Sequence, residues 1–198
     1  MSELHDANRR MLLTALAGLT LSGAVLTPAV ANTPNRQNNS RTLVVYFSRS
    51  GNTRVIAGVI HRHLNADLFE IEPATAYPDD YFQTVQQAKN QHDQGVKPAL
   101  KHNVTNFERY HTIYLGFPIW GTSVPPVVQT FLSSHDFSSK LVIPFITHGG
   151  YGIGNSEEIL AGLAAAAKRE NPLVIECDQE RKTTEIVTNW LAAIRHQV

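Results

Sequence analysis

Residues 48–53 (Ser-Arg-Ser-Gly-Asn-Thr) combine hydroxyl groups, a glycine and a helix start in one short turn. They follow an apolar run and precede apolar residues at helical spacing. The first amides of a helix have no intrahelical acceptor and carry a partial positive charge, so they attract anions. Ser48, Ser50 and Thr53 add hydroxyl donors, and Gly51 lets the backbone approach a ligand closely. This composition predicts a phosphate site that needs no lysine.

Two further glycine-containing loops follow strand-like runs later in the chain. Residues 116–123 (GFPIWGTS) include Trp120, and a tryptophan in a loop is costly to leave in water unless it covers something flat. Residues 147–154 (THGGYGIG) hold four glycines within six residues, a backbone that can wrap the edge of a ligand. In open parallel α/β sheets, ligands bind beyond the carboxyl ends of the strands. We therefore expect all three loops to contribute to one site.

The turn differs from other well-known nucleotide and nucleophile motifs. It lacks the terminal Gly-Lys of a Walker A loop and is not a G-x-G-x-x-G dinucleotide fingerprint. The G-x-S-x-G of a hydrolase nucleophile elbow is also absent from the chain. The sequence therefore supports none of these three kinds of site in the turn.

The segment Tyr46–Thr53 resembles the FMN phosphate loop of the flavodoxin family, whose pattern is (T/S)-x-(T/S)-G-x-T, and the resemblance extends from Thr42 to the C-terminal helix. It implies non-covalent FMN, with the phosphate in the turn and the isoalloxazine ring between the second and third loops. It also implies that Gly121 forms the backbone turn near flavin N5. The residues implied to bind FMN are Ser48, Arg49, Ser50, Gly51, Asn52, Thr53, Pro118, Ile119, Trp120, Gly121, Thr122, His148, Gly149, Gly150, Tyr151 and Gly152.

Several of these residues have ordinary structural roles open to them as well. The turn 48–53 can be a simple helix cap, since Ser and Thr are common there. Trp120 can fill the core between the sheet and the third helix. Tyr151 can stack on the ring, close the pocket, or lie in solvent on a mobile loop. His148 can tune the flavin, donate a proton, or make a structural hydrogen bond.

Residues at the edge of the predicted site also have more than one possible role. Arg49 can face solvent or reach the phosphate. Tyr77 and Tyr81 can edge the pocket, although anchoring the second helix is the more common role for such rings.

Apolar periodicity predicts the elements that position these loops. Short β-rich runs alternate with longer amphipathic segments, which indicates a parallel sheet with helices on both faces. The resemblance adds a flavodoxin-like three-layer sandwich, with a five-stranded sheet in the order 2-1-3-4-5. The predicted strands are Thr42–Phe47, Leu68–Ile71, Thr112–Leu115, Lys140–Thr147 and Leu173–Glu176. The predicted helices are Thr53–Leu64, Asp79–His92, Pro125–Leu132, Ser156–Arg169 and Thr183–His196.

Charge and composition exclude some classes of partner and cofactor. The chain has 17 basic and 17 acidic residues, so it lacks the excess positive charge that nucleic-acid binding requires. Its single cysteine, Cys177, allows neither an intrachain disulfide nor a cysteine metal cluster. Its nine histidines form no H-E-x-x-H motif, and we expect no metal.

Residues 1–31 read as an export signal rather than as part of the fold. Arg9 and Arg10 precede an apolar run, and small residues lead to Ala31. The paired arginines resemble a twin-arginine signal, which exports folded proteins across the bacterial inner membrane; an ordinary signal is the alternative. The apolar run is shorter than the roughly 20 residues of a spanning helix. We expect a linker over residues 32–41, a domain over residues 42–198, a periplasmic location and no stable membrane insertion after the signal is removed.

Two functions fit a domain with FMN as its redox centre. The first is an electron carrier that serves a redox partner protein or a small electron acceptor. The second is an FMN-dependent reductase of quinones or similar small acceptors, although no nicotinamide site is marked in the sequence. A flavin-free binding scaffold is a third possibility, because a fold does not determine function. The chain is neutral, whereas flavodoxins are commonly acidic, so the usual electrostatic docking is not expected.

Overall fold

The computed structural model describes residues 41–177 and 180–195, and these form an α/β unit. The strands are β1 (Thr42–Tyr46), β2 (Asp67–Glu70), β3 (Thr112–Pro118), β4 (Leu141–His148), β5 (Lys168–Arg169) and β6 (Leu173–Glu176). The helices are α1 (Asn52–Leu64), α2 (Tyr81–Asp93), α3 (Pro126–Ser134), α4 (Ser156–Leu163) and α5 (Glu180–Arg195), with a 3-10 turn, η1 (Phe107–Arg109).

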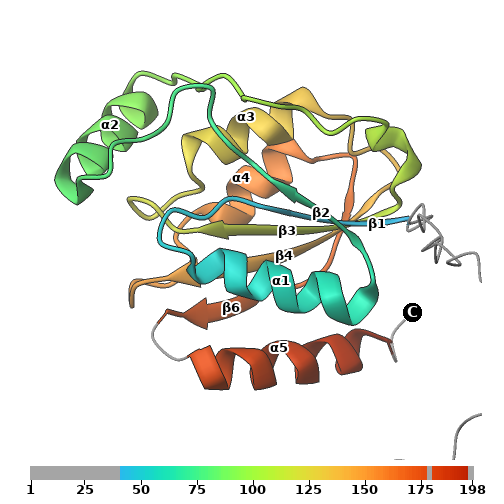
Figure 1. Ribbon diagram of the computed structural model, residues 1–198. Helices are drawn as coiled ribbons and strands as arrows, with labels where there is room; N and C mark the ends of the chain where they lie inside the picture. The colour runs from blue at the N-terminus through green and yellow to red at the C-terminus, as the bar shows by residue number, and fades with distance from the viewer. Residues whose placement is uncertain (1–40, 178–179, 196–198) are drawn as a thin grey trace, which may run out of the picture. The chain divides into compact units, whose positions relative to one another are not determined.

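All described strands pair in parallel, in the order β2-β1-β3-β4, and β5 and β6 share the fifth position beside β4 (Figure 1). This confirms the predicted fold class and strand order. One predicted element is wrong at its end. The helix predicted over Ser156–Arg169 stops at Leu163, and its last two residues, Lys168 and Arg169, pair as β5 with Leu141 and Val142. Local helix propensity was overridden there because the first half of β4 needs an edge partner.

The break between β5 and β6 contains Pro172, and the neighbouring strand β4 carries Pro144. The Lys168 amide bonds to the Lys140 carbonyl and the Glu170 amide to the Val142 carbonyl, at 2.9 and 3.0 Å, so these alternate residues face the edge strand. Pro144 is next in that series, and it has no N–H to offer. The position where Pro144 lacks an N–H therefore faces the gap in the edge strand at Pro172. Its absence removes no hydrogen bond from the pairing of β3 with β4.

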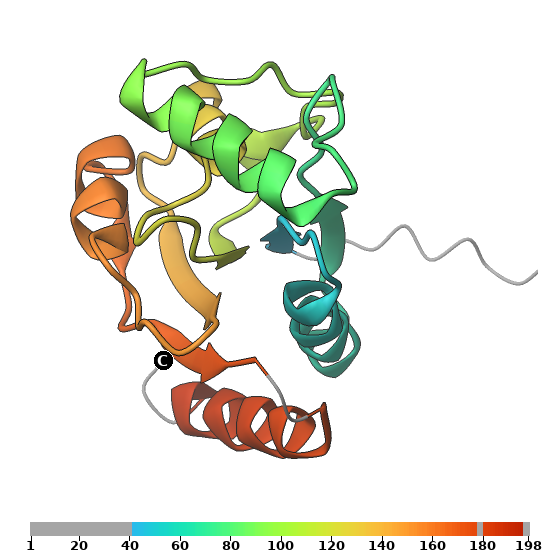
Figure 2. The ribbon, with the colours of Figure 1, turned by 90° about the vertical axis from the view of Figure 1, so that its left-hand side faces the viewer.

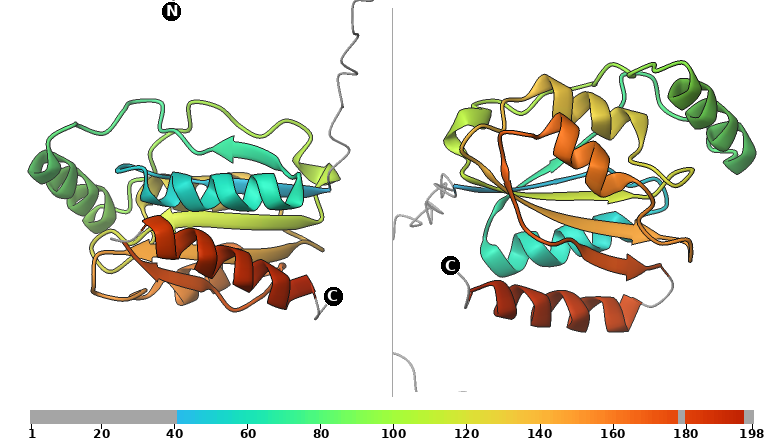
Figure 3. Two further views of the ribbon diagram at one scale, coloured as in Figure 1. Left: turned by 60° about the horizontal axis from the view of Figure 1, so that its bottom comes forward. Right: turned by 180° about the vertical axis from the view of Figure 1, so that it is seen from behind.

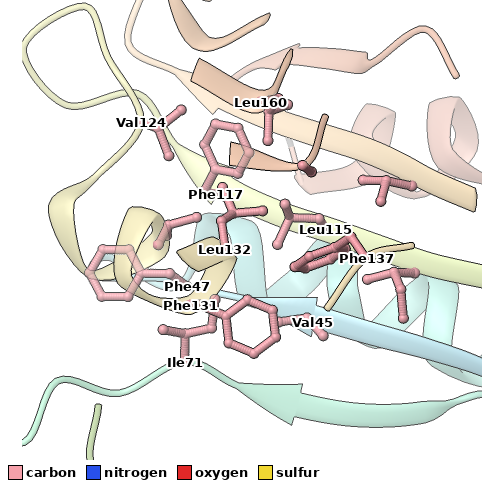
Figure 4. Close-up of a cluster of buried hydrophobic side chains, with 14 of the residues drawn as sticks. Val45, Phe47, Ile71, Leu115, Phe117, Val124, Phe131, Leu132, Phe137 and Leu160 are labelled. Atoms are coloured by element: carbon pink, nitrogen blue, oxygen red, sulfur yellow. The ribbon is translucent and has the colours of Figure 1, made fainter. Parts of the chain in front are cut away.

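Helices cover both faces of the sheet. α3 and α4 lie on one face, while α1 and α5 lie side by side on the other (Figures 1 and 3). Alternate residues of each strand point to opposite faces, so one run of apolar residues serves two cores. Each large apolar side chain buried there contributes roughly 1.5–3 kcal/mol. The α3/α4 face includes Val45, Phe47, Leu115, Phe117, Phe131, Leu132 and Leu160 (Figure 4). The α1/α5 face includes Val44, Tyr46, Ile56, Ile60, Phe145, Val187 and Leu191.

α2 stands apart from both layers, near the carboxyl ends of the strands (Figures 1 and 3). Asp80 caps it by accepting the Gln83 amide at 2.8 Å. The apolar side of this helix includes Phe82 and Val85, which are 78% and 46% exposed, whereas Thr84 is buried. The apolar side therefore faces solvent at the rim of the predicted site rather than the core.

The predicted export signal (1–31) and all but the last residue of the predicted linker (32–41) lie outside the described residues, as does His196. Among residues 41–177 and 180–195, no helix has the length and apolar character needed to cross a membrane.

Candidate functional site

The three predicted loops meet at the carboxyl edge of the sheet. They follow β1, β3 and β4, which are neighbours in the sheet, so their ends converge (Figure 2). β1 and β3 flank the point where the connections turn to opposite faces, which is where open α/β sheets bind ligands. The tertiary structure thus brings together residues that are about a hundred positions apart in the chain.

The turn after β1 presents an uncapped helix head. Gly51 is the N-cap of α1 with φ +94°, a conformation that favours glycine, and it has no side chain to accept the first-turn amides. Its own amide donates to Ser48 Oγ at 3.1 Å, which leaves the Ser48 proton available. Ser50 and Asn52 are exposed beside it. The first amides of α1 therefore have no side-chain cap in this turn, and the phosphate site stays a prediction.

Thr53 differs from its neighbours in the turn because it is buried. It is 1% exposed, and its Oγ1 lies 2.9 Å from Thr147 Oγ1 at the end of β4. The hydrogen bond ties the head of α1 to the strand that leads into the third loop. The sequence analysis predicts Thr53 as an FMN-binding residue and assigns no role to Thr147.

Arg49 bridges the turn to the start of α2. Its guanidinium donates to the Asp79 carbonyl at 2.8 Å and lies 5.7 Å from the centre of the Tyr81 ring. Arg49 is exposed, and facing solvent is one of its two predicted alternatives. Its side chain ties the segment before α2 to the turn 48–53.

The second loop is a tight turn at the end of β3. Pro118 is the last residue of β3, and the Ile119 amide donates to the Thr147 carbonyl at 2.8 Å. Trp120 and Ser123 exchange two backbone hydrogen bonds of 3.0 Å. Gly121 and Thr122 between them have φ of +52° and +66°, the pattern of a type I′ turn. Glycine suits this conformation, whereas a β-branched residue in it stores about 1–3 kcal/mol of strain.

Trp120 packs in a cluster of three aromatic rings. Its ring lies 5.1 Å from Phe47 and 4.9 Å from Tyr77, both edge to face. Tyr77 donates to Gln91 Oε1 of α2 at 3.0 Å, so it anchors the second helix. Burial raises the pKa of the Tyr77 phenol to about 12. Trp120 is partly exposed and packs against the core on the α3/α4 face, which is one of its predicted alternatives.

The third loop carries an exposed ring on a glycine-rich backbone. Tyr151 is 89% exposed, and Gly150 and Gly152 have positive φ. The Gly150 amide donates to His148 Nδ1 at 3.1 Å, so in this geometry the proton of the neutral imidazole lies on Nε2. The His148 carbonyl accepts the Cys177 amide at 3.0 Å. His148 therefore makes the structural hydrogen bond that was one of its predicted alternatives.

The glycines of the three loops separate into those that face open space and those pressed against protein. A β-carbon added to Gly51, Gly121, Gly149 or Gly152 would meet nothing within 4 Å. A β-carbon on Gly154, by contrast, would lie 1.8 Å from the Thr122 carbonyl oxygen. The open glycines leave room for a ligand beside the backbone of each loop, which fits a phosphate at α1 and a planar ring between the second and third loops.

A hollow of about 300 Å³ lies away from the three loops, near the amino ends of β1 and β2. It is lined in part by Asp67, Arg109 and Tyr110, which are joined by hydrogen bonds. None of the predicted FMN-binding residues lines it. Among the described residues, no group of three or more histidine, cysteine or acidic side chains is placed to hold a metal.

Comparison with known proteins places this architecture in a family. The family model described as flavodoxin matches residues 41–194. A protein from Bacteroides eggerthii, described as a candidate flavoprotein, is 28% identical, with a TM-score of 0.67 over 78% of this chain and 97% of its own. Its counterpart from Bacteroides uniformis is 29% identical, with a TM-score of 0.65 over 74% of this chain and 97% of its own.

A more distant flavoprotein from Lactobacillus acidophilus, solved in complex with FMN, has the same fold. It is 21% identical, with a TM-score of 0.57 over 73% of this chain and 97% of its own. None of the curated proteins compared with the chain matches it. The family match covers the whole unit that carries the three loops, and the chain belongs to the flavodoxin family.

Proposed function

We propose that this chain binds FMN non-covalently at the carboxyl edge of its sheet and passes electrons through it. The observation that carries the proposal is the head of α1 at Gly51, which has no side-chain cap and where an added β-carbon would meet no atom within 4 Å. The Lactobacillus acidophilus flavoprotein, which was solved with FMN, supports the same cofactor. FMN supplies one- and two-electron redox chemistry when bound.

Different residues would bind the phosphate and the ring of the cofactor. Ser48, Ser50 and Asn52, with the first amides of α1, would hold the phosphate through hydrogen bonds to its oxygens. Trp120 and Tyr151 would flank the ring, and the backbone of both loops would meet its polar edge. Residues 116–125 and 147–156 contain no Asp, Glu, Lys or Arg. Additional negative charge on a reduced cofactor would therefore find little compensation, which would lower its reduction potential.

Protruding rings at the rim of the site favour a protein as electron acceptor. Tyr81, Phe82 and Tyr151 are 61%, 78% and 89% exposed, so they stand out from the surface rather than line a hollow. Small ligands prefer concave sites, whereas protruding aromatic side chains suit contact with another protein. Because residues 116–125 and 147–156 contain no Asp, Glu, Lys or Arg, we propose a redox partner whose docking face is uncharged where it meets these two loops.

Titration of flavin-free protein with FMN tests the cofactor proposal. We expect saturable quenching of FMN fluorescence, and Ser50→Asp should weaken binding at least about tenfold, because the carboxylate repels the phosphate. Ser138→Asp, at an exposed serine before β4, is the matched control and should bind as the wild type does. Absence of saturable quenching in the wild type would refute the proposal.

Turnover separates the electron carrier from the reductase. FMN-loaded protein is mixed with NADH or NADPH and a soluble benzoquinone, and oxidation is compared with that by free FMN. A carrier should add nothing to the free-FMN rate. Sustained oxidation above that rate would instead assign the chain as a reductase.

We further propose that the protein works in the bacterial periplasm after export by a twin-arginine signal. The support is the pair Arg9-Arg10 before an apolar run that ends in small residues. Cell fractionation should find the flavin-containing protein in the periplasm, and Arg9→Lys with Arg10→Lys should retain it inside. Export that persists in the lysine variant would indicate an ordinary signal.

A further inference from the structure

Thr147 makes direct contact with both of the other site loops. It is the penultimate residue of β4, it is 1% exposed, and the third loop begins beyond it. Its hydroxyl lies 2.9 Å from Thr53 Oγ1 in the phosphate turn, and its carbonyl accepts the Ile119 amide of the second loop at 2.8 Å. Resting on the proposed FMN function, we propose that Thr147 is the positioning residue that holds the phosphate turn in its binding geometry.

Burial makes the hydroxyl pair a strong positional constraint. Both threonines are 1% exposed, so water cannot readily replace either partner. A buried hydroxyl without a partner is costly, which fixes each group where it can reach the other. Thr53 is the second residue of α1, and its backbone amide belongs to the first turn of that helix. Restraining its side chain therefore restrains the amides that would meet the phosphate.

Substitution of Thr147 distinguishes phosphate binding from ring binding in an experiment. Thr147→Val removes the hydroxyl and keeps the backbone carbonyl, so it should loosen the phosphate turn while the second loop stays attached. Riboflavin lacks the phosphate but carries the same ring. We expect the FMN dissociation constant of Thr147→Val to rise about 5- to 15-fold and that of riboflavin to change less than about twofold.

Conservative and remote variants provide the controls. Thr147→Ser keeps the hydroxyl and should recover most of the FMN affinity. Thr130→Val removes a different threonine hydroxyl, which bonds to the Pro126 carbonyl at 3.2 Å in α3, and should leave both affinities unchanged. If Thr147→Val does not fold, Thr147→Ala and Thr147→Ser differ only by the hydroxyl and make the same comparison.

A double-mutant cycle tests the route of the effect. Thr53→Val should also weaken FMN, and adding Thr147→Val to it should cost little more, because the pair is already broken. The inference is overturned if Thr147→Val weakens FMN and riboflavin equally, if it changes neither, or if the two substitutions add independently. Failure of wild-type protein to bind FMN would instead refute the proposed function, so the two failures are distinguishable.

Discussion

Gly154 lies directly against the carbonyl of Thr122. A β-carbon at position 154 would fall 1.8 Å from that oxygen, and the Asn155 amide donates to the same oxygen at 3.0 Å. The end of the third loop is therefore fastened to the turn of the second. This contact lets two glycine-rich loops keep one relative position.

Gly154→Ala should destabilise the protein and disturb the ring half of the site. The added methyl meets backbone atoms, and φ of +54° is unfavourable for alanine, so we expect a loss of about 2–4 kcal/mol in the free energy of unfolding. Gly95→Ala is the matched control, since Gly95 has φ of +64° and open space around it. It should lose only about 1–2 kcal/mol in urea denaturation. Equal losses in both variants would refute the close contact.

Trp120→Ala should weaken FMN and riboflavin by the same factor, because Trp120 belongs to the ring wall rather than to the phosphate turn. Stacking on an aromatic side chain is worth about 1–3 kcal/mol, so we expect a loss of roughly 5- to 100-fold for both ligands. Trp190 packs against Tyr114 at 5.8 Å on the α5 face. Trp190→Ala should reduce stability without changing either affinity. A loss confined to FMN would place Trp120 at the phosphate instead.

Lys140→Met should cost about 2–4 kcal/mol of stability, because it removes the donor for several buried carbonyls. Lys140 is 6% exposed, and its Nζ lies 2.6 Å from the Tyr110 carbonyl, 3.2 Å from that of Phe107 and 3.4 Å from that of Glu108. Burial lowers the pKa of this amine. Lys97→Met, at an exposed lysine that bonds Ser133 Oγ, should change stability by less than about 0.5 kcal/mol. Urea denaturation of both variants measures the difference.

Stability should fall as the pH rises above 10, and Tyr77 should account for part of the fall. Burial raises the pKa of Tyr77 to about 12, so the folded protein keeps this proton where the unfolded chain has lost it. The unfolded chain then binds fewer protons, and unfolding becomes easier with rising pH. Tyr77→Phe should lessen the loss between pH 9 and 11 by about 1 kcal/mol, allowing for partial solvent screening.

The alternation of strand-like and helix-like segments was sufficient to predict a parallel sheet with helices on both faces. That pattern is local: a strand buried on both faces is apolar throughout, and a helix repeats its apolar residues every three or four positions. The chemistry of the turn 48–53 was also readable, because the head of a helix offers its amides wherever it occurs. The alanine-rich run before Lys168 was wrongly predicted to continue as a helix through Arg169, whereas Lys168 and Arg169 pair with β4.

The sequence by itself thus determined which segments form strands and helices, and that three polar loops leave the sheet on the same edge. Only the tertiary structure decided which side chains meet across those loops: Thr53 with Thr147, Gly154 with Thr122, and Arg49 with the carbonyl before α2. It also decided that Phe82 faces solvent. The reason is physical. Periodicity along a chain reports burial of one segment at a time, whereas contacts between segments depend on strand register and loop path, which no single segment encodes.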